Sequence, residues 1–499
     1  MINDCRASSA TCTTEAFASL TLNNIKIISL NVTAARNYST SGGGSFGGGS
    51  DGTGGVGVIS ASTGQGGSTV DICLIEMEYT HPGQNDNHRF LMDGGGGWLA
   101  GGESEVLSPV ASGYTSSSTD GGHNSSAEAA DWGLTRKQAT EIYFGAKPKY
   151  SYWNGCSTGG RQAHVMAQRF PEQFDGIVGG SPAINWDKFE PATFWPDFMA
   201  RFLGKFLQSL LVYLSNAIFL VNVAPPSCVL NAFTDAAISA CDLLDGVKDN
   251  IISYPGQCHF KASSLVGRTI SCKDPVGEIK VTPKMAELVT ALWEGPNSVE
   301  GQFEWYGLHY DADLTGTLTT TCTSVSNCTV KVFLARNSSL DVDNLTHEDF
   351  DRFFRESVDQ YSSIIGTENP DLTNMKRAGT KMIAWHGMQV PLIPTNGTVD
   401  YYTRAMEVDS HVNDYYRFFL APGVTHCGGG DGFDPSDFVF DTLTAWVENG
   451  TVPNRLEATA TAVKPHNTST TRAGYLCPYP KVFTFNGENP NKESFFKCV

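Results

Sequence analysis

Apolar runs of strand length and a helix-like pattern follow one another in the region 150–182, where they predict part of a parallel sheet. A short strand over 150–153 leads through a glycine-rich turn into a helix over 161–169, and a second strand follows over 176–179. This order of strand, turn, helix and strand is typical of α/β proteins. The region therefore predicts the α/β class.

The same pattern returns towards the C-terminus. The apolar runs Lys381–Trp385 and Arg417–Ala421 predict two buried strands. A helix is predicted over Asp437–Asn449, with Gly450 as its C-terminal stop. Alternating apolar residues over Val70–Thr80 predict one more strand, well before the first region.

Residues 186–375 separate these regions and show no regular alternation of strands and helices. An insertion between strands of such a sheet is usually a lid over the substrate pocket. We therefore expect a core built from 70–185 and 376–499, with a lid domain over 186–375. Residues 1–69 form an N-terminal segment, whose glycine- and serine-rich tract 41–67 predicts a flexible surface loop.

One stretch, Phe202–Val223, is almost wholly apolar and needs its own explanation. A transmembrane helix of about 20 residues would fit its length. A buried helix, or a segment wrongly included in the gene model, is the preferred interpretation, because a membrane helix here would anchor a secreted chain through its lid.

Composition and charge exclude several classes of partner. The 499 residues include 52 acidic and 34 basic ones, which gives a formal net charge of −18. Nucleic acids and anionic membranes bind basic surfaces, so neither is an expected partner.

Cysteine usage and glycosylation sequons both indicate secretion. The 13 cysteines include no C-x-x-C pair, which favours disulfides in an oxidising compartment over a zinc site. The first 12 residues lack the pattern of a signal peptide, so we expect a secreted protein whose signal peptide is not part of this chain. N-x-S/T sequons, which predict a glycoprotein, are frequent: they begin at Asn31, Asn37, Asn124, Asn327, Asn337, Asn344, Asn396, Asn449 and Asn467.

The strongest chemical motif is G-x-S-x-G at Gly155–Gly159, between a predicted strand and a predicted helix. In such a turn the flanking positions leave no room for side chains, and the strain pushes the serine hydroxyl into the pocket. Ser157 is therefore the candidate nucleophile. The amide of Thr158, at the helix start, would face the oxyanion formed during acyl transfer.

A serine nucleophile requires a base, and His426 is the best candidate. It follows the predicted last strand, where hydrolases of this type carry their histidine. His386 and His123 are the alternatives. Cys156 precedes the serine and Cys427 follows the histidine, so a disulfide between them would hold both catalytic loops together.

These residues resemble the CS-D-HC motifs of the fungal tannase and feruloyl esterase family, with CS at 156–157 and HC at 426–427. The resemblance covers most of residues 70–499. It implies a secreted α/β-hydrolase that cleaves phenolic esters, with an inserted, disulfide-rich lid and a structural calcium. A second oxyanion amide is expected from Gly95 or Gly96. Further matches lie at 79–86, 94–98 and 179–183.

A short acidic loop fits the calcium that the resemblance implies. Asp242, Asp245 and Asp249 offer the clustered oxygens that a hard cation prefers, although their spacing is not that of an EF-hand. The resemblance adds the backbone carbonyls of Val247 and Ile251. A disulfide between the cysteines that bracket the loop is expected, and other cysteines are expected to be bridged too: they are Cys241 and Cys258 for the loop, and Cys322, Cys328, Cys477 and Cys498 elsewhere.

The chain departs from the family where the triad acid should lie. The family carries H-G-x-x-D-x-x-I-P, whereas His386–Pro394 places Val390 at the aspartate position. Asp400 is the fallback acid, and Asp409 and Asp414 lie further along the chain. Two other departures are a shortened stretch at 85–89 and the apolar stretch at 202–223.

The sequence thus predicts a serine carboxylic-ester hydrolase for feruloyl or galloyl esters, which works through an acyl-enzyme and is slowed by the missing acid. The motifs do not distinguish these two ester classes. An inactive protein that binds phenolic esters is one alternative, and a protein anchored by the stretch 202–223 is another. The expected partners are small-molecule phenolic esters, with no nucleic acid and no membrane.

Overall fold

The computed structural model of the chain forms two compact units. The first is built from residues 1–153 and 169–175, and the second from 154–168 and 176–499. The residues that the structure describes are 12–17, 26–39, 55–60, 69–80, 116–119, 149–211, 225–273, 276–315, 317, 329–337, 339–460, 472–487 and 496–499.

The first unit contains a four-stranded antiparallel sheet in the order β1-β3-β2-β4. The strand β3 confirms the prediction for 70–80, since it spans Thr69–Thr80. The other members are β1 (Lys26–Ser39), β2 (Gly55–Ser60) and β4 (Ser116–Thr119), and two short 3-10 helices, η1 (Thr14–Phe17) and η2 (Pro171–Gln173), belong to the same unit.

The strand β2 corrects the prediction of a loop over the whole tract 41–67. Val56, Val58 and Ile59 are β-branched residues, which favour a strand even among glycines. The strand pairs with β3 on one side and β4 on the other, so its backbone groups gain partners that the composition did not reveal.

The second unit carries the predicted parallel sheet, in the order β10-β9-β6-β5. Pairing is parallel between β10 and β9 and between β9 and β6. The strands β6 and β9 are almost completely buried, which explains their uninterrupted apolar sequences. Their bounds are β5 (Tyr152–Cys156), β6 (Gly176–Gly180), β9 (Lys381–Gly387) and β10 (Tyr416–Ala421).

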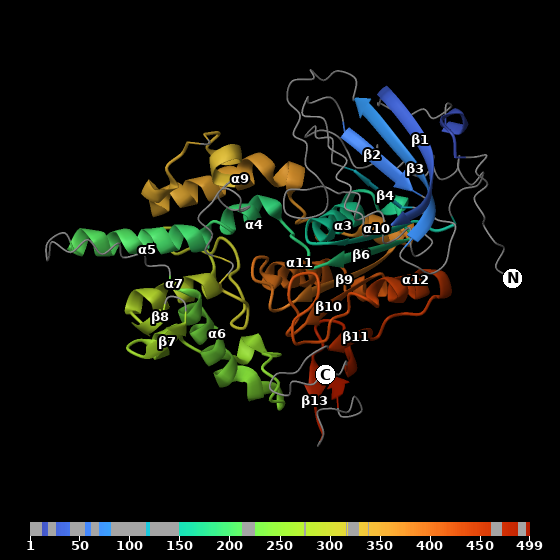
Figure 1. Ribbon diagram of the computed structural model, residues 1–499. Coiled ribbons are helices and arrows are strands. Elements are labelled where there is room, and N and C mark those ends of the chain that lie inside the picture. Colours follow the sequence, from blue (N-terminus) through green and yellow to red (C-terminus); the bar gives the residue numbers. More distant parts are fainter. Residues whose placement is uncertain are drawn as a thin grey trace. The chain divides into compact units, whose positions relative to one another are not determined.

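Three helices of the core accompany this sheet (Figure 1). Helix α3 (Thr158–Arg169) begins three residues earlier than predicted, directly after Ser157. Helix α12 (Val439–Asn449) packs against β6 and β9, and its predicted stop is confirmed because Gly450 adopts a left-handed conformation with φ +68°. Helix α11 (Thr395–Val408) follows β9 and contacts it.

The inserted segment, residues 186–375, lies wholly within the second unit and is mainly helical. In Figure 1 most of its helices, coloured green to orange, lie to the left of β6, β9 and β10. The elements are α4 (Trp186–Ala192), α5 (Trp195–Leu211), α6 (Ser227–Cys241), η3 (Asp242–Asp245), η4 (Pro255–Gln257), η5 (Ala262–Leu265), β7 (Thr269–Lys273), β8 (Val276–Lys280), α7 (Pro283–Glu294), the π-helix η6 (Thr329–Leu334), η7 (Val342–Asn344), α9 (His347–Ile365) and α10 (Thr373–Ala378).

Aromatic packing explains why the helix α5 forms where an apolar stretch was noted. Phe194 lies directly before it, Trp195 begins it, and Phe198 stacks against Phe350 of α9 with ring centroids 5.3 Å apart. The first half of α5, which lies mostly before the apolar stretch, is therefore a core helix; within the stretch Phe202 is exposed and Leu203 buried, and the buried helix over the stretch stays a prediction. Residues 212–223 of the stretch lie outside the described residues.

Four disulfides join two described cysteines each, all in the second unit, and Cys12 of the first unit is also disulfide-bonded. Two of them join expected cysteines, Cys241 to Cys258 and Cys477 to Cys498. A third, Cys228–Cys272, was not predicted. Cys322 and Cys328 lie outside the described residues.

One described segment, Ser227–Asp245, is long and apolar enough to span a membrane by length and composition. Core helices of globular proteins meet the same criteria. Both ends of this segment are held by disulfides, through Cys228 and Cys241.

The chain ends in two small antiparallel pairs. One pair is β11 (Leu456–Ala460) with β12 (Arg472–Leu476), and the other is β13 (Phe483–Phe485) with β14 (Phe496–Cys498). Before them, the 3-10 helix η8 (Val412–Asp414) leads into β10.

Candidate active site

Ser157 lies at a strained turn between β5 and α3. Its φ is +61°, in the left-handed region that non-glycine residues rarely adopt. Its amide donates to the carbonyl of Gly180 at 3.0 Å, and its own carbonyl accepts from the amides of Arg161 and Ala183. These bonds hold the turn, so the predicted strand–serine–helix elbow is confirmed.

The glycines around the serine have different roles. A Cβ on Gly155 would lie 2.7 Å from the backbone of Gly159, which confirms the steric need for glycine there. The same expectation is wrong for Gly159, because a Cβ at that position would meet nothing within 4 Å. Gly160, which the prediction missed, is the second constrained position: its Cβ would lie 2.4 Å from the carbonyl of Gly180, where α3 crosses β6.

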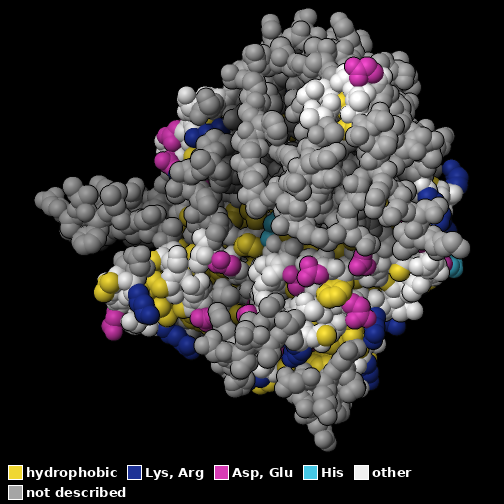
Figure 2. Space-filling view, turned by 45° about the vertical axis from the view of Figure 1, so that its right-hand side comes forward, with side chains coloured by type: hydrophobic (Ala, Val, Ile, Leu, Met, Phe, Trp, Pro, Cys, Tyr) yellow, Lys and Arg dark blue, Asp and Glu magenta, His cyan; other side chains and the backbone are white. Residues whose placement is uncertain are grey.

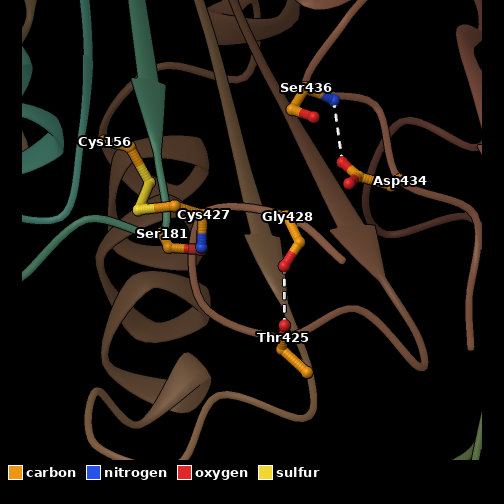
Figure 3. The surroundings of a disulfide bond; sticks show 7 residues. All are labelled: Cys156, Ser181, Thr425, Cys427, Gly428, Asp434 and Ser436. Atoms are coloured by element: carbon orange, nitrogen blue, oxygen red, sulfur yellow. Dashed lines mark hydrogen bonds between the residues drawn. A yellow bond between two sulfur atoms is a disulfide. The ribbon is translucent and has the colours of Figure 1, made fainter. Parts of the chain in front are cut away.

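The loop after β10 carries His426 and is braced by its own polar groups (Figure 3). The hydroxyl of Thr425 donates to the carbonyl of Gly428 at 2.6 Å. Asp434 accepts from the amides of Gly429 at 2.6 Å and Ser436 at 2.9 Å. The loop therefore has a defined conformation around the histidine.

The predicted disulfide Cys156–Cys427 is confirmed, with Cα atoms 5.8 Å apart. The amide of Cys427 also donates to the Ser181 hydroxyl oxygen at 3.4 Å, close to the sulfurs in Figure 3. Because these cysteines adjoin Ser157 and His426, the bridge links the serine elbow to the histidine loop. The expected hydrogen bond between Ser157 Oγ and the His426 ring stays a prediction.

The His426 ring has one buried nitrogen that lacks a partner. Nδ1 neither donates nor accepts a hydrogen bond among the described residues. Burial lowers the pKa of His426 from 6.5, because the charged imidazolium is poorly solvated there. A triad acid would bind this nitrogen and favour the charged ring.

The loop after β9 lies beside the histidine loop. The amide of Gln389 donates to the carbonyl of Val424 at 3.0 Å, and a Cβ on Gly387 would lie 2.3 Å from that same oxygen. Val390 follows directly and is only 2% exposed. The segment that carries the acid in the resemblance is thus held against the residues that precede His426, and it presents a valine.

Two of the three carboxylates that could replace the triad acid form ion pairs with other residues, and the third lies at the other end of β10 from His426. Asp400 bonds Arg404 Nε at 2.9 Å on the surface of α11. Asp409 bonds Lys376 Nζ at 2.7 Å, and this bond is the main reason why its pKa is lowered to about 2. Asp414 lies in η8, before β10, whereas His426 follows the opposite end of that strand.

Two other predicted residues and one alternative cannot be placed. Gly95 and Gly96, the candidates for the second oxyanion amide, lie outside the described residues, and so does His123.

Thr158 is buried at the first position of α3, where helix amides have no partner within the helix. His386 is fully buried in β9, which makes it unsuitable as a base that must reach the substrate.

Comparison with known proteins identifies the family. The family described as "Tannase and feruloyl esterase" matches residues 58–499. The chain belongs to this family. Members of the tannase and feruloyl esterase family are named for two carboxylic-ester hydrolases, and the sheet order and serine elbow agree with its α/β-hydrolase-like fold.

Individual relatives cover most of the chain. A probable feruloyl esterase of Arthroderma benhamiae is 34% identical over 488 residues, covering 87% of this chain and 86% of the relative. The tannase of Aspergillus oryzae is 25% identical over 532 residues, covering 87% and 85%. The solved tannin acyl hydrolase of Aspergillus niger superposes with a TM-score of 0.77 at 22% identity, covering 99% of this chain and 96% of that structure, which shows a shared fold.

The acidic loop, where a calcium is expected, combines crowded carboxylates with hydrogen bonds to its own backbone. Burial, Asp245 and Asp242 together raise the pKa of Asp249 to about 7, so the carboxylates repel one another. Among the described residues, however, no three such side chains are arranged to hold a metal ion. Each carboxylate turns back to its own loop: Asp242 accepts from the amides of Asp249 and Asn250, Asp245 from Val247, and Asp249 from Ile251.

Proposed function

We propose that this chain hydrolyses phenolic esters, of the feruloyl or galloyl type, through an acyl-enzyme on Ser157. The observation that carries the proposal is the disulfide from Cys156 to Cys427, because it links a strained serine turn to a loop that presents a histidine. Relatives named feruloyl esterase and tannase align with most of the chain, which supports this substrate class.

In the proposed reaction, Ser157 Oγ attacks the carbonyl carbon of the ester while His426 Nε2 takes the serine proton. The tetrahedral oxyanion accepts hydrogen bonds from the Thr158 amide and from an amide of Gly95 or Gly96. Collapse releases the alcohol, which receives the proton from His426. Water then attacks the acyl-enzyme with His426 as base, and the phenolic acid and free Ser157 result.

The proposal includes slow turnover. Val390 can neither fix the tautomer of His426 nor stabilise the imidazolium that forms in the transition state. Burial already disfavours that imidazolium, as the lowered pKa of His426 indicates. An inactive protein that retains the phenolic-ester pocket is the second candidate, and the unpartnered Nδ1 of His426 is the observation that favours it.

A hydrolysis panel separates these two candidates. We expect slow release of 4-nitrophenol from 4-nitrophenyl acetate and barely measurable cleavage of methyl ferulate and methyl gallate. Ser157→Ala is the control and should abolish the first activity. Equal rates with and without the serine would exclude the acyl-enzyme, and tight binding of methyl ferulate without any turnover would identify a binding protein.

We propose that the inserted segment acts as a lid and carries a structural calcium. The ligands would be the carboxylates of Asp242, Asp245 and Asp249 with the carbonyls of Val247 and Ile251, an all-oxygen set that suits calcium. The crowding of buried carboxylates supports a cation here, and the bond Cys241–Cys258 closes the loop that carries them.

Calcium is expected to raise the thermal stability of the protein. A chelator should lower Tm by several degrees, as expected when a ligand that binds only the folded state is removed, and added calcium should restore it. In Asp249→Asn, which removes one charge from the set, the effect of the chelator should be much smaller. A chain whose Tm ignores both chelator and calcium would refute the site.

We further propose secretion with N-glycosylation. The four disulfides support an oxidising compartment. Every sequon asparagine with a described exposure is exposed: Asn31, Asn337, Asn344, Asn396 and Asn449. Digestion of the secreted chain with an N-glycosidase should reduce its mass, and an unchanged mass would contradict the glycan prediction.

The surface charge supports small-molecule partners over nucleic acid. Figure 2 shows that acidic side chains are spread over the described surface of one face, with basic side chains mainly towards its edges. With a formal net charge of −18, such a surface repels phosphate backbones.

A further inference from the structure

Two buried histidine nitrogens on neighbouring segments lack hydrogen-bond partners. One is Nδ1 of His426, described above. The other is Nε2 of His386, a residue with 0% exposure near the end of β9. An unpaired buried polar atom is costly, and two on one site require an explanation.

The backbone segments that carry these histidines lie next to each other. Gly387, which follows His386, packs against the carbonyls of Val424 and Thr425, the residues directly before His426. On the other side of β9, the amide of Ser181 donates to the carbonyl of Trp385 at 2.8 Å, and Ser181 in turn accepts from the amide of Cys427. Residues one position from His386 are thus bonded to, or packed on, the immediate surroundings of His426.

Electrostatics agrees with this placement. Burial is the main cause that lowers the pKa of His386 well below 6.5, and the charge of His426 is the next cause. The lowered pKa favours the neutral form of the His386 ring.

The other contacts of His386 define its tautomer. Its Nδ1 lies 2.9 Å from Thr398 Oγ1, and the ring also bonds the backbone of Ile393, whose carbonyl can only accept. Because Nε2 has no partner, the ring hydrogen belongs on Nδ1. Nε2 of His386 then carries a lone pair and can accept a hydrogen bond.

We propose that His386 is a positioning residue for His426, whose Nδ1–H donates to His386 Nε2 through one bridging water molecule, since the two nitrogens do not bond each other directly. This bond would fix His426 in the tautomer that leaves Nε2 unprotonated for Ser157. A neutral imidazole does not stabilise the imidazolium as a carboxylate does, so His386 replaces only the orienting half of the missing acid. Its kinetic consequence rests on the proposed esterase function.

The kinetic test compares two substitutions of His386. An asparagine side chain can replace the Nδ1 donor but has no atom at the Nε2 position, whereas glutamine reaches the Nε2 position. We expect His386→Asn to lower kcat on 4-nitrophenyl acetate by about tenfold with little change in KM, and His386→Gln to lose much less.

The same substitution in a Val390→Asp background separates positioning from structural damage. The new carboxylate would bind His426 Nδ1 itself, so His386→Asn should there cost less than about threefold. Equal losses of kcat in both backgrounds would show that the substitution acts through general structural damage and would overturn the proposal.

A tautomer measurement completes the test and does not depend on activity. The ¹⁵N chemical shifts of the His426 ring should show a protonated Nδ1 in the unsubstituted chain and a mixture of tautomers in His386→Asn. If these shifts do not respond to the substitution, the proposal fails. If they respond but no variant hydrolyses esters, the esterase function fails while the positioning role stands.

Discussion

Val390→Asp is expected to raise kcat for methyl ferulate by about 10²- to 10⁴-fold, with little change in KM. In well-studied serine hydrolases, loss of this carboxylate lowers turnover by roughly 10⁴-fold. The carboxylate acts mainly in the transition state, where it stabilises the imidazolium. The position fits the task, because the loop of Val390 is bonded to Val424, close before His426, and His426 Nδ1 has no partner there.

Two measurements make this prediction specific to the charge. Val390→Asn has nearly the same shape without the charge and should recover only a small part of the rate. A carboxylate also raises the pKa of the histidine, so the acid limb of kcat/KM should move to higher pH in Val390→Asp than in the unsubstituted chain. Equal rates for both variants and the original chain would show that another group already supports His426, or that His426 is not the base.

Removal of the disulfide Cys156–Cys427 is expected to damage both stability and catalysis. The bridge joins residues 271 positions apart. Its loss, in a Cys156→Ser/Cys427→Ser variant, should lower the free energy of unfolding by about 2–5 kcal/mol. The serine turn and the histidine loop would lose their covalent link, and small misplacements of reacting groups can cost about 100-fold in rate.

The chain offers a matched control for this effect. Cys228–Cys272 lies in the inserted segment and bridges 44 positions, and neither cysteine adjoins a candidate catalytic residue in the sequence. Its double serine variant should also lose stability but keep kcat on 4-nitrophenyl acetate within about threefold. Denaturant unfolding and initial rates at a temperature where both variants are folded check the difference. Equal catalytic losses in the two variants would contradict a specific role for the Cys156–Cys427 bridge.

Much of the core was predictable because buried parallel strands have continuous apolar sequences. β6, β9 and β10 appear at nearly their predicted positions for this reason. The strand β2 was missed because its pairing with β3 and β4 is a tertiary property that a glycine-rich composition hides. The Cys228–Cys272 bridge was missed because spacing alone does not select a partner among 13 cysteines.

The candidate site was predictable where a sequence motif fixes the local backbone geometry. It was not predictable where the function depends on the direction in which a side chain points. The serine elbow follows from its glycines and its place between a strand and a helix. The acidic loop has the right residue types, but whether Asp242 and Asp249 face a common point or their own backbone amides cannot be read from their spacing. His386 looked like an alternative base, and only its complete burial shows otherwise.

The order in which the site can be assembled during synthesis follows from the chain positions of its parts. The serine elbow, β5, α3 and β6 are complete once about the first 180 residues have emerged. β9, which pairs with β6, and β10, which pairs with β9, emerge some 200 residues later, after the whole inserted segment. Cys427 follows them, so Cys156 cannot form its final disulfide until 271 further residues have been translated. The proposed catalytic centre is therefore among the last parts of the molecule to close, and a chain interrupted between residues 157 and 426 carries the proposed nucleophile without its proposed base.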